Sequence, residues 1–249
     1  MVKSFYEYIN EDASGNSNVS GYADDIINVI RKVSITNEYE ESRELEYKDD
    51  NSFDLIVQVK KETDPNFETD SHFSDLPWEE INFKDYGFAM DANTNINKGD
   101  NMIPEITFTF IINPDREPKL YDELKFKLID IVTHELNHTN QVGWNREPFK
   151  VRPTSGKVRD SINGSFDYFQ LVDEIESMIA GMYARSQAEE VPLDKIIDNY
   201  LTPFLKDNQL TQHEYDYIFK LWLRHALENY PDSQLSSSRP NVKKIIDSI

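Results

Sequence analysis

Apolar residues recur along the chain with two different spacings, and these spacings predict its elements. Isoleucines and valines at helical spacing predict a first buried helix at residues 22–33. Runs rich in β-branched and aromatic residues predict strands at residues 53–59, 86–90 and 106–112. The last run ends at an Asn-Pro-Asp sequence, which is typical of a strand terminus.

Beyond this point the apolar pattern becomes helical. It predicts helices at residues 121–142, 169–188, 193–205 and 211–229, and a last short piece from Asn241. Because the strands come first and the helices follow, the order predicts an α+β fold, with a twisted N-terminal sheet and a mostly helical C-terminal part.

The pattern also predicts how the chain is organised. Residues 1–21 combine a few apolar positions with a Gly-, Ser- and Asn-rich stretch, which is typical of a docking arm on a flexible tether. We expect residues 22–249 to form a single domain. Its β-rich, acidic part covers residues 22–118 and its helical part covers residues 119–249.

Charge and composition narrow the possible partners and metals. The 249 residues include 46 acidic and 26 basic side chains, a formal charge of -20, which disfavours nucleic acid and anionic membranes. There is no cysteine, so any metal must be bound by imidazole or carboxylate. The N-terminus has no apolar signal-peptide core and no stretch approaches the roughly 18 to 20 apolar residues of a membrane span, so we expect a cytoplasmic, non-secreted protein.

One motif carries recognisable chemistry. The sequence His-Glu-Leu-Asn-His places His134 and His138 four residues apart, with Glu135 beside the first histidine. On a helix the two imidazoles point about 40° apart with a rise of about 6 Å, so both can reach one zinc ion. Glu135 lies about 100° round the helix, where its carboxylate can act as a general base on the water that the metal activates.

The context of the motif supports this interpretation over a chance pair of histidines. Leu124, Leu128, Val132 and Leu136 form a row at i+4 spacing beside the histidines, with Ile129 broadening it, and this row predicts a buried helix. A second His-Glu pair, at His213, has Tyr217 where the second histidine would stand. We therefore assign the second pair no metal role.

A third protein ligand is needed, since catalytic zinc sites commonly use three ligands and a water. The next helix carries Glu174 and Glu176 on opposite borders of its apolar stripe. The helical wheel permits either carboxylate to face the metal, and it also permits both to be solvated charges.

The two motifs together resemble a known group of enzymes. The HELNH motif, followed on a later helix by the glutamate-rich sequence EIES, resembles gluzincin-type zinc metallopeptidases. Residues 133–141 and 173–186 are similar in particular to HExxH peptidase-like proteins encoded by tailed bacteriophages. The resemblance covers residues 105–190. It implies a zincin-like fold, with the strand at residues 106–112 as the edge strand that pairs with an extended peptide substrate.

The resemblance also implies roles for individual residues. In this group the third ligand is usually the glutamate three residues before a small residue, which selects Glu174, three before Ser177. Met178 stands where the family often carries a further acid. Some members have a tyrosine shortly before the ligand glutamate, so Tyr168 is a candidate donor to the oxyanion, with His213 and Tyr217 as alternatives; Tyr168 is equally compatible with a packing role.

The sequence thus predicts a zinc-dependent endopeptidase that acts on a protein or peptide substrate, with the host cell cytoplasm as its compartment if it is phage-encoded. A second interpretation is a zincin-like structural or interaction protein with little or no peptidase activity, such as a virion component that docks through the N-terminal arm. The presence of Glu135 favours the enzyme, because a purely structural zinc site needs no base beside its ligands.

Overall fold

The computed structural model describes residues 15–35, 40–46, 52–61, 88–95, 105–113, 120–141 and 164–236. Tertiary contacts divide the chain into two compact units, residues 17–128 and residues 129–249 with 1–16. The division lies inside the motif helix rather than at its start, and the single domain remains a prediction. No helix among the described residues combines the length and the apolar character needed to cross a bilayer.

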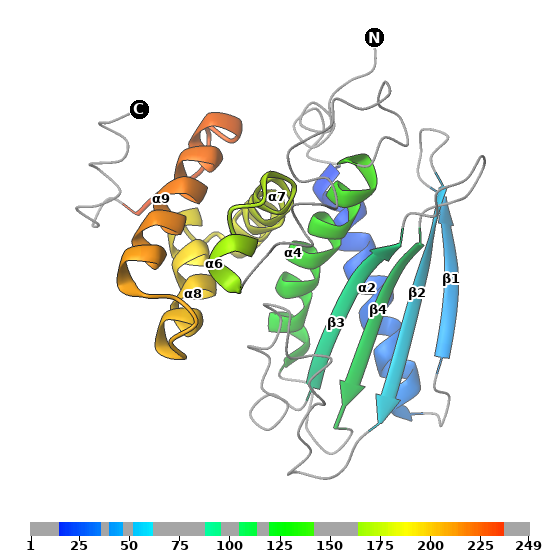
Figure 1. Ribbon diagram of the computed structural model, residues 1–249. Coiled ribbons are helices and arrows are strands. Elements are labelled where there is room, and N and C mark those ends of the chain that lie inside the picture. The colour runs from blue at the N-terminus through cyan, green and yellow to red at the C-terminus, as the bar shows by residue number, and fades with distance from the viewer. Residues whose placement is uncertain are drawn as a thin grey trace. The chain divides into compact units, whose positions relative to one another are not determined.

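The first unit contains a mixed four-stranded sheet. Its strands are β1 (Glu40–Glu46), β2 (Ser52–Lys61), β3 (Phe88–Asn95) and β4 (Glu105–Ile112), in the order β1-β2-β4-β3 (Figure 1). The β2 and β4 strands pair in parallel, and the other two pairs are antiparallel. The predicted strands at residues 53–59 and 106–112 are confirmed.

Strand β4 lies inside the sheet, which overturns one expectation. Every residue of β4 pairs with β2 on one side and with β3 on the other. The prediction that residues 106–112 form the edge strand for a peptide substrate is therefore wrong. Its apolar run reflects a central position, since Ile106, Phe108 and Phe110 are all buried. The edges of the described sheet are β1 and β3.

The two edge strands were the hardest to predict. The sequence of β1, Glu-Glu-Ser-Arg-Glu-Leu-Glu, has a single apolar residue, and its strand geometry depends on pairing with β2. Strand β3 begins two residues after the predicted start at Tyr86 and continues to Asn95. Burial at Phe88 and Met90 anchors its first half.

Helix α2 (Gly15–Ile35) lies along one face of the sheet (Figure 1). It contains the predicted helix at residues 22–33 and begins earlier, within the stretch expected to be a flexible tether. Residues 1–14, the first part of the arm and tether predicted at residues 1–21, lie outside the described residues. An ion pair of 2.9 Å between Asp24 and Lys125 joins α2 to the first half of the motif helix.

The remaining helices follow the strands in the order predicted. They are α4 (Leu120–Gln141), α6 (Ser165–Tyr168), α7 (Val172–Glu189), α8 (Leu193–Lys206) and α9 (Gln212–Asn229). The predicted helix from residue 169 instead starts at Val172, after the short helix α6 and a turn. Thr211 caps α9 through a reciprocal pair of hydrogen bonds with Glu214. The predicted piece from Asn241 lies outside the described residues.

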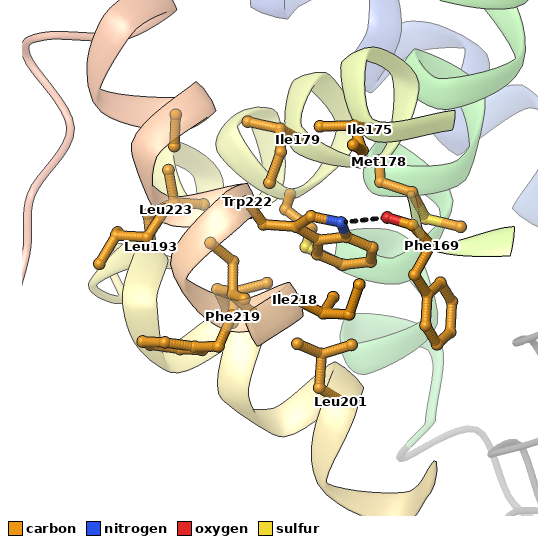
Figure 2. Close-up of a cluster of buried hydrophobic side chains, with 14 of the residues drawn as sticks. Phe169, Ile175, Met178, Ile179, Leu193, Leu201, Ile218, Phe219, Trp222 and Leu223 are labelled. Carbon is orange, nitrogen blue, oxygen red and sulfur yellow. Dashed lines mark hydrogen bonds between the residues drawn. The ribbon is translucent and has the colours of Figure 1, made fainter. Parts of the chain in front are cut away.

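An apolar core holds α7, α8 and α9 together (Figure 2). Its centre is Trp222, fully buried, whose indole Nε1 donates to the carbonyl oxygen of Phe169 at 2.9 Å. The Phe169 ring in turn meets the rings of Trp222 and Phe204 edge to face, with centroids 5.4 Å and 5.0 Å apart. This packing connects α9 to the turn that precedes α7. The described fold is thus mixed, with a small sheet and a mostly helical remainder, compatible with the predicted α+β class.

Candidate metal centre

Three side chains from two helices converge in the helical unit. His134 and His138 come from α4 and Glu174 comes from the first turn of α7. The two histidine Nε2 atoms are 2.9 Å apart. Glu174 Oε2 lies 3.7 Å from Nε2 of His134 and 3.5 Å from Nε2 of His138. Within the described parts of the chain, this is the one group of three such side chains that could share an ion.

The donor atoms fit a divalent transition metal. Two imidazoles and one carboxylate form a ligand set that zinc accepts, at bond lengths of about 2.0 to 2.2 Å. Tetrahedral geometry with such bonds places the ligand atoms roughly 3.3 to 3.5 Å apart. The observed separations of 2.9 to 3.7 Å bracket that value. Three protein ligands also leave a fourth coordination position for a water or a substrate.

The motif helix presents its histidines as the spacing predicts. The two rings have centroids 4.5 Å apart and planes at 82°. Their Nε2 atoms approach each other to 2.9 Å. The predicted apolar flank is buried, including Leu128, Val132 and Leu136. His134 is buried, while the side chain of His138 retains 16% of its exposure. Solvent therefore reaches the cluster on the side of His138.

The structure separates the two candidate glutamates. Glu174 is 2% exposed and lies in the cluster, whereas Glu176 is half-buried and outside it. The charge of Glu176 acts on His225 of α9: burial lowers the pKa of His225, and Glu176 opposes that shift. Glu174 is therefore the carboxylate that meets the histidines, and it is not a solvated flank charge.

A close crossing of α4 and α7 brings the ligands together. A Cβ atom at Gly181 of α7 would collide with both the carboxylate and the backbone carbonyl of Asp130 in α4. Only glycine permits this approach, because a backbone carbonyl cannot rotate away as a side chain can. One turn further along α7, Arg185 lies 4.0 Å from the Asp130 carboxylate. The sequence offered no signal for this crossing.

Tyr168 lies at the cluster. Its hydroxyl donates to Glu174 Oε2 at 2.8 Å, and that oxygen is also the one closest to the histidines. Its ring meets Phe169 edge to face at 5.7 Å and packs against the apolar core. The ring thus packs against the core and the hydroxyl makes a polar contact at the cluster, while donation to an oxyanion stays a prediction.

Two further residues support His138, and sequence reasoning missed both. The Oγ of Ser177 in α7 lies 3.3 Å from His138 Nδ1, the ring nitrogen that faces away from the cluster. Asn137 Nδ2 donates to the same Oγ at 3.1 Å. Ser177 is fully buried and Asn137 nearly so. The available signal was position, since Ser177 follows Glu174 by one helical turn.

The other candidate residues are not among the three side chains of the cluster. Glu135 is 4% exposed, an unusual degree of burial for a carboxylate, and it lies outside the group of ligand atoms. His213 is exposed, and the carboxylate of its neighbour Glu214 accepts hydrogen bonds from Thr211 at the start of α9. Tyr217 is also exposed and its ring meets Phe166. Neither His213 nor Tyr217 therefore belongs to the group of candidate metal ligands.

Comparisons of the chain with family models, with curated proteins and with solved structures gave no match. The chemistry of the site therefore has to be argued from its own residues.

Proposed function

We propose that this protein is a zinc-dependent endopeptidase. The observation that carries the proposal is the convergence of His134, His138 and Glu174 within 4.8 Å of one another, next to Glu135 in the same helical turn. Two imidazoles and one carboxylate are a ligand set used by metallopeptidases, and they leave one position for the reacting groups. A metal site with three protein ligands supports catalysis better than a structural role, for which four protein ligands are usual.

The residues of the site have distinct tasks in this proposal. Zinc bound there would supply a Lewis acid and lower the pKa of the attacking water to about 7. Glu135 takes a proton from this water and passes it to the leaving amine as general acid.

The tyrosine at the cluster is the proposed donor to the developing oxyanion. Its hydroxyl lies at hydrogen-bonding distance from Oε2 of Glu174, and this contact supports the proposal. Hydrogen-bond donors aimed at developing charge are usually a large contribution to catalysis. In this proposal the hydroxyl of Tyr168 bonds Glu174 in the resting protein and the oxyanion during hydrolysis. The substrate is a protein or peptide.

A second candidate is a zincin-like structural or interaction protein, such as a virion component, with weak or no hydrolysis. The burial of the cluster favours it, since His134 and Glu174 are almost inaccessible to solvent. Both candidates bind zinc, so metal analysis alone cannot distinguish them. Hydrolysis and its dependence on Glu135 can.

The test is a comparison of Glu135→Gln with the parent protein on denatured proteins and peptide libraries. The nearly isosteric change should retain zinc and fold but reduce hydrolysis by about 10²- to 10⁴-fold, the usual contribution of a general base. Glu176→Gln is the matched control, since it removes a nearby carboxylate outside the cluster and should leave the rate unchanged. Phenanthroline should abolish activity, and added zinc should restore it.

A parental rate in Glu135→Gln would show that this residue is not the base. No hydrolysis in the zinc-loaded parent would favour the structural candidate.

A further inference from the structure

Histidine can bind a metal through one ring nitrogen only if the proton sits on the other. A neutral imidazole carries its proton on Nδ1 or on Nε2, and the hydrogen bond made by the distal nitrogen selects between the two forms. In this cluster both histidines face the other ligands through Nε2. His138 therefore has to carry its proton on Nδ1 when a metal is bound.

The residue that meets Nδ1 of His138 is Ser177. The distance from its Oγ to the ring nitrogen is 3.3 Å, and the serine is fully buried. Ser177 follows Glu174 by one helical turn on α7, so a single helix face holds one ligand and supports another. Met178, the next residue along α7, is part of the apolar core.

Asn137 also contacts the serine hydroxyl. A hydroxyl has one proton to donate and two lone pairs with which to accept. The side-chain amide of Asn137 donates to Ser177 Oγ at 3.1 Å and thereby uses one lone pair. The second lone pair is available to a proton on Nδ1 of His138. The amide and the imidazole then both donate to one buried oxygen, and this contact orients the imidazole.

We propose that Ser177 and Asn137 are positioning residues that hold His138 in the Nδ1-protonated form and direct its Nε2 at the metal. The inference rests on the metal site of the proposed function, but not on peptide hydrolysis. Partners of this kind orient metal ligands in many proteins, and their removal typically weakens metal binding by about 10- to 100-fold. A serine held by an asparagine would perform here what a carboxylate or a carbonyl performs elsewhere.

The test measures zinc affinity by competition with a chelator, without any substrate. Ser177→Ala should weaken zinc binding by about 10- to 100-fold. Ser177→Thr keeps a hydroxyl at the same position and should bind zinc close to the parental affinity. Ser186→Ala is the matched control. Ser186 is a buried serine on the same helix whose hydroxyl donates to the carbonyl of Val191, away from the cluster, so its loss should not change zinc affinity.

Nitrogen NMR of the metal-free protein gives a second readout that general destabilisation would not change. At a pH where the imidazole is neutral, His138 should carry its proton on Nδ1 in the parent and in Ser186→Ala. In Ser177→Ala and Asn137→Ala the Nε2-protonated form should become populated.

Two results would overturn the inference alone: parental zinc affinity in folded Ser177→Ala, or a parent whose His138 carries its proton on Nε2. Failure of the parent to bind zinc would instead overturn the metal site together with the inference. Absence of hydrolysis in a zinc-loaded parent would leave the inference standing and contradict only the enzyme.

Discussion

Helix α7 has two sides with different partners. One side, with Ile175, Ile179 and Met182, belongs to the apolar core shared with α8 and α9. The other side carries Glu174 and Ser177, which meet polar groups of α4. The apolar side needs shape and volume, which many side chains can supply. The polar side needs particular atoms at hydrogen-bonding or coordination distance. Single-atom changes there should therefore reduce metal binding or activity more than they reduce the free energy of unfolding.

Removing the indole of Trp222 should disrupt the apolar core most severely. Trp222→Ala leaves a large cavity and removes the hydrogen bond to Phe169, so the free energy of unfolding should fall by about 3 to 5 kcal/mol. Zinc affinity of the protein that remains folded should stay near the parental value. Urea unfolding and a zinc competition titration check the two expectations.

Tyr217→Ala on the same helix serves as the control, because this aromatic is exposed and should cost less than about 1 kcal/mol. Equal destabilisation by both substitutions would contradict the importance of the core.

Tyr168 links the two sides, with its ring against the core and its hydroxyl at the cluster. Tyr168→Phe keeps the ring and removes only the hydroxyl. If the hydroxyl donates to the oxyanion, kcat should fall by about 10²- to 10³-fold, as for other lost oxyanion donors. Zinc affinity should change far less. Steady-state kinetics at saturating zinc, beside a zinc titration, separates the effects; a parallel fall of zinc affinity and activity would restrict Tyr168 to orienting Glu174.

The crossing of α4 and α7 should be sensitive to a single methyl group. Gly181→Ala places a Cβ atom against the backbone of Asp130, so the helices must move apart, at a cost of about 1 to 3 kcal/mol in unfolding free energy. Zinc affinity should fall too, because His134 belongs to α4 and Glu174 to α7, and separating the helices separates these two ligands.

The matched control is Gly21→Ala in α2, a helical glycine with open space around its Cβ position. It should stabilise the protein by roughly 0.5 to 1 kcal/mol. Loss of stability in both variants, or in neither, would contradict a specific close approach at Gly181.

Local sequence patterns predicted many of the helices and strands. Helices α4, α8 and α9 were predicted within a few residues, because each has an apolar stripe at helical spacing and a clear start or stop. The strand β1 was not, since its seven residues hold only Leu45 as an apolar side chain. The order of strands in the sheet was not predictable either, and the edge role expected for residues 106–112 failed for that reason.

Some residues of the site could likewise be predicted from the sequence, and others could not. The i and i+4 histidines follow from helix geometry and can be predicted from sequence with little else. The helical wheel left Glu174 and Glu176 open, and only the resemblance selected the first; burial in the structure agrees with that choice. The supporting contacts of Ser177 with Asn137 and His138 depend on how two helices cross, which no single helix encodes.

The most direct test of the proposed metal centre is a zinc measurement on the parent, two histidine variants and two matched glutamate variants. The parent should bind about one zinc per chain, and His134→Ala or His138→Ala should abolish binding, because the chain has no cysteine to substitute. Glu174→Gln should weaken zinc binding strongly, whereas Glu176→Gln should leave it unchanged. Strong zinc binding in Glu174→Gln together with its loss in Glu176→Gln would contradict the centre described by the structure.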